Sequence, residues 1–510
     1  MLGNKKSSNA ILVQQPRAQL SQGCQDNHNT KQCDRQIQGA KFGGVCETTP
    51  GVKSYSGYVN LDENTHMVFW FFEARKNYDS NTGLPTNFSN PTGRFSGIRE
   101  DYSTDTTALA AVTAWEMIQA FFGTLSRLDP TVKSRRFHLW TESYGGHWGP
   151  GFYRHFYEQS ERMRNGTTAG GGGGVQLEME SLGIINGLIS PRVQYPFLPE
   201  FVRNNTHGIS VNEFTYKMMK LNFEMPGGCR EAIDNCILVG HDTPQGATLC
   251  AHAHMMCQSL VMVPFAALGG RDHYDIRAVA GADVPPTYWM DYVNTARVQD
   301  ALGVDLNYTD KLNIGVNFAF GLQGEQVRDT TFHDLEWLLG KGVRVALIYG
   351  DADFVCNWVG GEAVSLALNW TNATSFAKAG YAPFTIPTNT GETSDKNKTY
   401  GATRQYGGLS FTRVYEAGHI VPYYQPAAGL ELFRRVLRNR ATAKTQFTPT
   451  FESHGSANAT ATNAGWDQGA MFTGRPGDRK KRRGLDLGKR GEMDGRTDSF
   501  WRNPRKQLVS

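Results

Sequence analysis

The sequence predicts an α/β fold built around a central, mostly parallel β-sheet. Short apolar segments alternate with segments whose apolar residues recur at helical spacing, which is the order of strands and helices in such a sheet. Several of the apolar segments end in Ser, Asp or His, the place where α/β proteins carry functional groups. The chain has 510 residues, which is long enough for one large domain or two. Hydrophobic residues make up 39% of it and charged residues 20%, a composition typical of globular proteins.

The N-terminal part of the chain holds one expected strand and one expected helix. Residues 1–45 are polar and rich in turn formers, and we expect an extended, irregular arm there. The segment "HMVFWFFEA" (66–74) is a continuous apolar run, typical of a strand buried on both faces. Residues 75–105 are crowded with Asn, Ser, Thr, Gly and Pro and predict a loop, whereas residues 107–125 have the apolar period of an amphipathic helix.

Four more strands and a closing helix are expected further along the chain. The strands are "RRFHLWTE", "LGIINGLIS", "GVRVALIYGDADF" and "LSFTRVYEAGH", and the helix is "AAGLELFRRVLRN" (135–142, 182–190, 342–354, 409–419 and 427–439). The glycine run at 169–175 predicts a flexible hinge. The polar region at 195–285 predicts an insertion that lies over the core.

Half of the eight cysteines lie in this insertion, at positions 229, 236, 250 and 257. A zinc site and a pair of disulfides are the competing interpretations. No C-x2-C pair is present, and the six, thirteen and six residues between successive cysteines fit a metal site poorly. We therefore expect disulfides that hold an irregular insertion together, with a pairing that the sequence does not reveal.

The net charge of +4 is concentrated at the C-terminus. From Gly465 onward there are twelve Lys or Arg and six Asp or Glu, so the rest of the chain is close to neutral. The tail at 441–510 contains "DRKKRRG" and "LGKRG", which would suit a nuclear-localisation-like or nucleic-acid-binding patch or dibasic processing sites. A disordered, solvated charge run or a read-through segment fits better, and we expect no nucleic-acid partner.

Signals for the cellular compartment disagree. Eight N-x-[ST] sequons and the expected disulfides favour the secretory route; the sequons begin at Asn87, Asn165, Asn204, Asn307, Asn369, Asn372, Asn397 and Asn458. The apolar stretch at Ala10–Val13 is too short for the core of a signal peptide, and we expect no window long enough for a membrane span. We therefore expect that the true start is missing from this sequence and that no membrane partner exists.

Three strand ends supply Ser143, an aspartate of "YGDADF" and His419. Taken singly, each has an ordinary explanation as a turn serine, a helix cap or a packed histidine. Their order along the chain is that of α/β-hydrolases, in which the serine sits on a strained strand-to-helix turn. The chemistry requires these types, because imidazole must take the serine proton and a carboxylate must hold the imidazole. The segment 141–145 reads T-E-S-Y-G and departs from G-x-S-x-G only in its first position.

These segments resemble the serine carboxypeptidase family, especially its fungal members. "TESYGGHWGP", "YGDADFVCNWVGGEA" and "VYEAGHIVPYYQP" look like the three catalytic blocks, and "VCETTPGVKSYSGYVNL", "LGIING", "YDIR" and "QDALGV" extend the likeness. The resemblance covers residues 46–440, between the arm and the tail. It implies an α/β-hydrolase fold with a cap insertion, secretion or delivery to a vacuole, and a serine-type carboxypeptidase that releases C-terminal amino acids from peptides through an acyl-enzyme.

The resemblance also assigns catalytic roles. Ser143 would be the nucleophile and His419 the general base. The family pattern G-D-x-D makes Asp353 the triad acid, while Asp351 would cap or brace the loop. The backbone N–H of Tyr144 would be one oxyanion donor.

Substrate-binding roles are implied for five other residues. Glu142 would hydrogen-bond the terminal carboxylate of the substrate, which requires a proton on one partner and so favours acidic pH. Cys356, Asn357 and Trp358 would line the far side of the pocket, and Ile420 would contact the departing residue. For these last four, packing around the triad is the competing interpretation.

One block of the family pattern is absent. After the strand at 66–74 the family has N-G-G-P-G and further strands, whereas this sequence contains no N-G-G-P-G, and Glu73–Thr107 is too short for the missing part. We therefore expect that some N-terminal strands of the sheet are missing. That block supplies a second oxyanion N–H, an asparagine for the substrate carboxylate and a carboxyl partner for Glu142.

The sequence thus predicts a serine carboxypeptidase homologue whose partners are peptide or protein C-termini and which needs no metal or organic cofactor. The alternative is a catalytically impaired homologue that binds peptides or other proteins, because of the absent block. A lipase or esterase on the same fold is disfavoured, because Glu142 beside Ser143 suits a substrate that carries a carboxylate.

Overall fold

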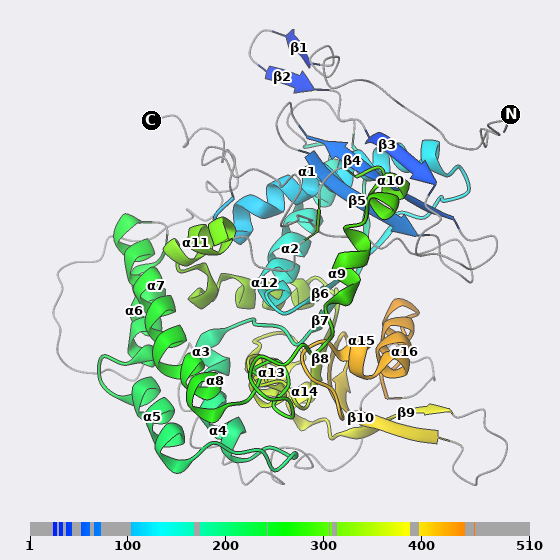
Figure 1. Ribbon diagram of the computed structural model, residues 1–510. Coiled ribbons are helices and arrows are strands. Elements are labelled where there is room, and N and C mark those ends of the chain that lie inside the picture. The colour runs from blue at the N-terminus through cyan, green and yellow to red at the C-terminus, as the bar shows by residue number, and fades with distance from the viewer. Residues whose placement is uncertain are drawn as a thin grey trace, which may run out of the picture. The chain divides into compact units, whose positions relative to one another are not determined.

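The structure is a computed structural model (Figure 1). It describes residues 53–61, 66–72, 104–167, 174–241, 243–304, 307–308, 314–387, 397–443 and 453, and the backbone of residues 24–27, 30–33 and 37–42. By its internal contacts the chain divides into Met1–Thr460 and Ala461–Ser510. Most of the expected loop at 75–105, most of the hinge at 169–175 and nearly all of the basic tail lie outside the described residues.

A six-stranded sheet with the order β6-β7-β8-β11-β10-β9 forms the centre of the described fold. The strands are β6 Arg136–Glu142, β7 Glu178–Ile185, β8 Arg344–Gly350, β11 Leu409–Val414, β10 Asn397–Tyr406 and β9 Ala382–Pro387. The first four run parallel, and β10 and β9 extend the sheet antiparallel. The predicted mostly parallel sheet is confirmed, although β9 and β10 were not predicted.

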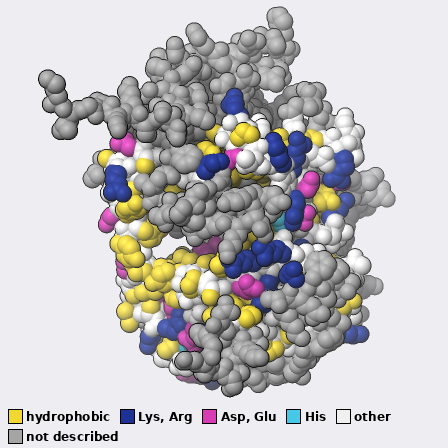
Figure 2. Space-filling view, turned by 90° about the vertical axis from the view of Figure 1, so that its right-hand side faces the viewer, with side chains coloured by type: hydrophobic (Ala, Val, Ile, Leu, Met, Phe, Trp, Pro, Cys, Tyr) yellow, Lys and Arg dark blue, Asp and Glu magenta, His cyan; other side chains and the backbone are white. Residues whose placement is uncertain are grey.

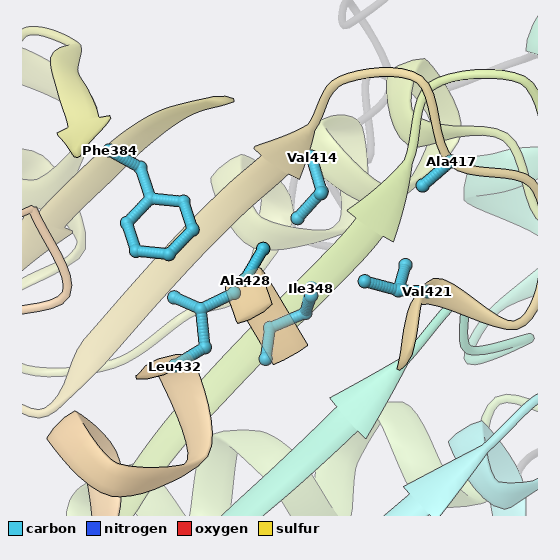
Figure 3. Close-up of a cluster of buried hydrophobic side chains, with 7 residues drawn as sticks. All are labelled: Ile348, Phe384, Val414, Ala417, Val421, Ala428 and Leu432. Atoms are coloured by element: carbon cyan, nitrogen blue, oxygen red, sulfur yellow. The ribbon is translucent and has the colours of Figure 1, made fainter. Parts of the chain in front are cut away.

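Helices cover both faces of β8, all of whose residues are buried. Ile348 of β8 packs in an apolar cluster with Ala428 and Leu432 of α16 (Pro426–Leu437; Figure 3). The ring of the next residue, Tyr349, lies against Gly361 of α13 (Trp358–Ala367). Since neighbouring residues of a strand point to opposite faces, α16 and α13 cover opposite sides of the sheet.

The expected helix after the N-terminal strand is confirmed as α1, Thr107–Leu128. It packs beside α2 (Gly145–Arg164), and α2 also contacts α12 (Thr330–Gly340). The shorter helical elements are α9 Tyr288–Val293, α10 Ala296–Leu302, α11 Ile314–Leu322, η3 Glu325–Val327, α14 Ala373–Lys378 and α15 Val421–Tyr424.

The N-terminal strands form sheets of their own within the described residues. The arm that we expected to be irregular contains a two-stranded pair, β1 Cys24–Asn27 with β2 Thr30–Cys33. A three-stranded antiparallel sheet joins β3 Ile37–Phe42, β4 Ser54–Asn60 and β5 His66–Phe72. The expectation that the strand at 66–74 is buried on both faces is only partly right, because Met67, Trp70 and Phe72 of β5 are half-exposed.

The two larger sheets are not joined by strand pairing in the part of the chain that is described. The side chain of Phe69 packs on Phe121 of α1, with ring centroids 5.6 Å apart. Strand β6 pairs only with β7 among the described strands, and most of its residues are half-buried. Within the described strands, β6 is thus an edge of the six-stranded sheet.

The expected insertion at 195–285 is helical over most of its length rather than irregular. It contains α4 Phe197–Arg203, α5 Glu213–Glu224, α6 Cys229–Val239, α7 Pro244–Cys257, η2 Gln258–Met262 and α8 Val263–Gly269, it is preceded by α3 Pro191–Gln194, and residues 270–285 form no helix. Disulfides join Cys229 to Cys257 and Cys236 to Cys250, which confirms the disulfide interpretation over zinc. The two cysteines of each helix are seven residues apart and so share one face, and α6 and α7 run antiparallel with these faces together.

We expected no segment long and apolar enough to cross a membrane. Judged by length and composition alone, that expectation is wrong. Thr107–Leu128 and Pro244–Gly269 both pass that test. The first is α1, whose apolar side belongs to the protein core, and the second continues from α7 into α8. Core helices of soluble proteins pass the same test, so these two helices are weak grounds for a membrane span.

Charges of both signs are mixed on the face of the molecule seen in Figure 2. Lys and Arg side chains lie there beside Asp and Glu side chains. This distribution is in keeping with a body that is close to neutral outside the basic tail.

Two glycine substitutions test the packing of α13 on the sheet. A Cβ atom added at Gly361 would lie 2.4 Å from the ring of buried Tyr349, whereas one added at Gly123 of α1 meets nothing within 4 Å. We expect Gly361→Ala to lower the free energy of unfolding by about 1–3 kcal/mol through overpacking. Gly123→Ala, the matched control in a helix, should raise it by about 0.5–1 kcal/mol. Chemical denaturation measures both, and equal stabilities of the two variants would contradict this packing.

Candidate active site

Ser143 lies on a sharp turn between β6 and α2. Its φ of 62° is in the left-handed region, which is strained for a residue with a side chain. Its N–H donates to the carbonyl of Ile185 at the end of β7 (3.0 Å), and its carbonyl accepts from Gly146 and Leu188 (both 2.9 Å). The turn is therefore held on both sides by backbone hydrogen bonds, and it presents Ser143 at the carboxyl edge of the sheet.

Thr141 takes the place of the first glycine of G-x-S-x-G. Its Oγ1 donates to the carbonyl of Gly145 at 2.9 Å. A Cβ atom at Gly145 would lie 2.5 Å from the Thr141 Cβ, and one at Gly149 would lie 2.8 Å from its Oγ1. The helix can approach a threonine at this position because two glycines of α2 face it, which is why the departure from the pattern is tolerated.

His419 and Asp353 form a buried pair at the ends of β11 and β8. The His419 Nδ1 atom lies 2.8 Å from Asp353 Oδ2, and the Asp353 side chain is fully buried. Burial by itself would lower the pKa of His419. The negative charge and hydrogen bond of Asp353, together with the charges of Glu142 and Asp272, outweigh burial, so the pKa of His419 is raised. The backbone N–H of His419 donates to the carbonyl of Tyr274 (2.8 Å), whose ring packs on the imidazole.

The Nε2 atom of His419 is buried and has no hydrogen-bond partner among the described residues. It is the imidazole atom left to take a proton from a nucleophile. The structure has no hydrogen bond between Ser143 and this nitrogen in its described part, and such bonds often tighten only when substrate is bound. Parallel pairing of β6, β7, β8 and β11 places Ser143, Asp353 and His419 at the same edge of the sheet.

The two aspartates of "YGDADF" have different surroundings. Asp353 contacts His419, whereas Asp351 accepts hydrogen bonds from Arg413 (3.3 Å) and from His207 (3.1 Å). Arg413 also lies over the ring of Trp358, with its guanidinium carbon 4.1 Å from the ring centroid. Asp351 thus ties its loop to the sheet and to the insertion, in keeping with the bracing position expected from the sequence.

Asn186 is a residue of this site that the sequence reasoning missed. It follows β7 with a φ of 41°, and it is fully buried. Its Nδ2 donates to Asp353 Oδ2 at 2.8 Å, and its Oδ1 accepts from the N–H of Gly350 at 3.0 Å. An available signal was its place directly after a buried apolar strand, the same place that singled out Ser143.

Glu142 and Tyr144 flank Ser143 on either side. Burial raises the pKa of Glu142. The positive form of His419 lowers this pKa, and the Asp353 charge raises it further.

Within the described residues the Tyr144 N–H makes no hydrogen bond, so it is free to act as an oxyanion donor. The Tyr144 hydroxyl donates to Glu325 Oε2 (3.0 Å), and Glu325 Oε1 accepts from the Thr107 N–H at the start of α1 (2.8 Å). This chain of contacts anchors the residue after Ser143 to a helix N-terminus.

The four residues expected to line the pocket have varied surroundings. Cys356 is an unpaired buried thiol with its sulfur within 4.8 Å of ligand atoms of Asp353 and His419, and burial raises its pKa well above the ordinary value. Asn357 caps α13 by accepting from the Gly360 N–H (2.9 Å), and Trp358 is buried beneath Arg413. Ile420 is half-exposed beside His419. Contact of these residues with substrate stays a prediction.

Comparisons with known proteins agree with this geometry. A family model described as serine carboxypeptidase matches residues 89–439. Carboxypeptidase S1 homolog B of Arthroderma otae is 32% identical over 78% of this chain and 75% of its own length. Carboxypeptidase S1 of Penicillium janthinellum is 29% identical over 79% of this chain and all of its own length.

Among solved structures, the prohormone-processing carboxypeptidase Kex1(delta)p of Saccharomyces cerevisiae has a similar fold. The match has a TM-score of 0.56 and 16% identity, and it covers 78% of this chain and 94% of that one. The expected α/β-hydrolase architecture is thereby supported independently of sequence likeness. This chain belongs to the serine carboxypeptidase family.

Proposed function

We propose that this chain is a serine-type carboxypeptidase that releases C-terminal amino acids from peptides through an acyl-enzyme. The observation that carries the proposal is the strained turn at Ser143 together with the buried Asp353–His419 pair at the same sheet edge, in a chain of this family. A serine, a histidine and an aspartate at the ends of parallel strands are the arrangement that acyl transfer requires.

The proposed reaction proceeds in two steps. Ser143 Oγ attacks the last peptide carbonyl while His419 Nε2 takes its proton, and the developing oxyanion accepts a hydrogen bond from the Tyr144 N–H. His419 then gives the proton to the departing amine, so the C-terminal amino acid leaves and the acyl-enzyme remains. Water, deprotonated by His419, hydrolyses the ester. Asp353 keeps the Nδ1 proton in place and stabilises the imidazolium throughout.

Selection of a free C-terminus is assigned to Glu142. Its pKa is raised above the ordinary value by burial, so it keeps its proton at pH values where an exposed glutamate is ionised. A protonated carboxyl can donate a hydrogen bond to the substrate carboxylate, whereas an ionised one would repel it. Binding of a free C-terminus should therefore be tightest at acidic pH, which is the basis of the proposed acidic preference. Turnover also needs neutral His419, and because the pKa of His419 is raised, loss of that form limits activity at the acid end.

The second candidate is a peptide-binding homologue with impaired turnover. In the described part of the chain, the Tyr144 N–H is the oxyanion donor that we identify. The family's second oxyanion N–H comes from the N-G-G-P-G block, which this sequence lacks. Losing one such donor typically costs about 100- to 1,000-fold in rate. Turnover with blocked dipeptides separates the two candidates.

An oxidising compartment, such as the secretory pathway or a vacuole, is the proposed location. Two disulfides support it, as do the exposed sequon asparagines Asn165, Asn204 and Asn369. Asn307 is buried in the folded chain and is not expected to carry a glycan.

Release of a free amino acid from an N-blocked dipeptide tests the catalytic proposal. We expect Ser143→Ala to lower kcat by about 10,000-fold or more, because the nucleophile is lost. Ser126→Ala, on the exposed side of α1, is the matched control and should keep wild-type activity. Wild-type protein that binds the dipeptide without releasing amino acid would favour the peptide-binding candidate, and an active Ser143→Ala variant would refute the assignment of Ser143.

The pH dependence of KM tests the role of Glu142. Since the pKa of Glu142 is raised, wild-type KM should increase as pH rises through that pKa and the proton is lost. Glu142→Gln keeps a neutral donor at every pH, so its KM should vary less and the ratio of wild-type to variant KM should grow with pH. Glu178→Gln, at the exposed start of β7, is the control and should follow the wild type. Parallel KM profiles for Glu142→Gln and wild type would contradict this role.

A further inference from the structure

We propose that Asn186 is a positioning residue that fixes the Asp353 carboxylate for its hydrogen bond with His419. This inference rests on the proposed function, because it concerns the same site. Among the described residues, the Asn186 side chain hydrogen-bonds neither Ser143 nor the imidazole of His419, and it acts through Asp353. It connects the end of β7 to the ends of β8 and β11, and so to the acid–base pair.

One carboxylate oxygen receives both donors. Asn186 Nδ2 and His419 Nδ1 each lie 2.8 Å from Asp353 Oδ2. The other oxygen, Oδ1, is buried without a hydrogen-bond partner in the described part of the chain. Since rotation of a carboxylate about its last bond is soft, a buried aspartate with a single donor would be poorly oriented. The second donor on Oδ2 directs that oxygen toward the imidazole.

The Asn186 amide is itself held in one orientation. Its Oδ1 accepts from the Gly350 N–H (3.0 Å), so its NH₂ group must face Asp353, and the backbone N–H of Asn186 donates to the Ile348 carbonyl (2.7 Å). The φ of 41° is one that asparagine tolerates better than most residues. Four features therefore meet in one residue: a left-handed backbone, a backbone donor, a side-chain acceptor and a side-chain donor.

A neutral donor suits the charges around Asp353. The titratable groups that interact with Asp353 or His419 are Glu142, Asp272, Tyr274, Tyr349 and Cys356. A lysine or arginine in place of Asn186 would stabilise the carboxylate, but its positive charge would also disfavour the imidazolium that must form during catalysis. A neutral amide orients Asp353 and leaves its negative charge available to stabilise the His419 imidazolium.

The test compares Asn186→Leu with Asn186→Asp. Leucine removes the donor, so kcat per active site, counted by titration with a covalent serine reagent, should fall by about 10- to 100-fold with KM unchanged. Aspartate beside Asp353 has its pKa raised by the neighbouring charge, so at acidic pH it is protonated and can donate in place of the amide. The ratio of kcat for Asn186→Asp over Asn186→Leu should therefore rise as pH falls.

Asn439 provides a matched control. It is another asparagine with a left-handed φ, 49°, and it accepts from Arg344 at the end of α16, away from Ser143 and His419. Asn439→Leu and Asn439→Asp should leave kcat and its pH dependence at wild-type values. If Asn186→Leu keeps wild-type kcat per active site, or if the ratio of the two Asn186 variants does not change with pH, the inference is overturned.

A spectroscopic measurement separates this inference from the proposed function. The low-field proton resonance of His419 Nδ1–H reports its hydrogen bond to Asp353 whether or not the protein turns over substrate. It should be present in wild type and in Asn186→Asp at acidic pH, and lost or shifted upfield in Asn186→Leu. An unchanged resonance in Asn186→Leu refutes the positioning role. Absent wild-type turnover, or full activity of Ser143→Ala, refutes the proposed function alone.

Discussion

Parallel pairing of β6, β7, β8 and β11 is the constraint on which the rest of the structure depends. It brings the carboxyl ends of four strands to one edge, where Ser143, Asn186, Asp353 and His419 follow the strands in that order. The buried core keeps this edge in register, because helices pack on both faces of the central strand β8. Residues up to 276 positions apart in the chain thereby form one site.

The site combines strained backbone with buried charge, and each is compensated locally. Left-handed conformations at Ser143 and Asn186 cost on the order of 1–3 kcal/mol each. Backbone hydrogen bonds with the neighbouring strands hold both turns. The buried Asp353 charge receives two donors on one oxygen, and Asp351 is paired with Arg413. A rigid, pre-oriented acid–base pair is the result, which is what differential stabilisation of a transition state requires.

The sequence predicted the parts of this fold that rest on local patterns. Apolar runs predicted β6, β7, β8 and β11, and strand ends identified Ser143, Asp353 and His419. Features that depend on tertiary context could not be predicted from local patterns. Asn186 looks like any asparagine before a glycine until its partner Asp353 is placed beside it. The polar composition of the insertion predicts irregular structure, whereas the seven-residue spacing of Cys229 and Cys236 and of Cys250 and Cys257 is the one local sign of its two paired helices. Strand β10 reads NKTYGATRQY and lacks the continuous apolar run that predicted the other strands.

The central claim is that His419, oriented by Asp353, activates Ser143 as a nucleophile. Reaction of the intact chain with a fluorophosphonate, followed by peptide mapping in a mass spectrometer, tests it most directly, because the reagent modifies serines that a neighbouring base has activated. This account predicts a single adduct on the peptide that contains Ser143, with none in a His419→Ala variant. An adduct on another serine, or equal labelling of the His419→Ala variant, would contradict it.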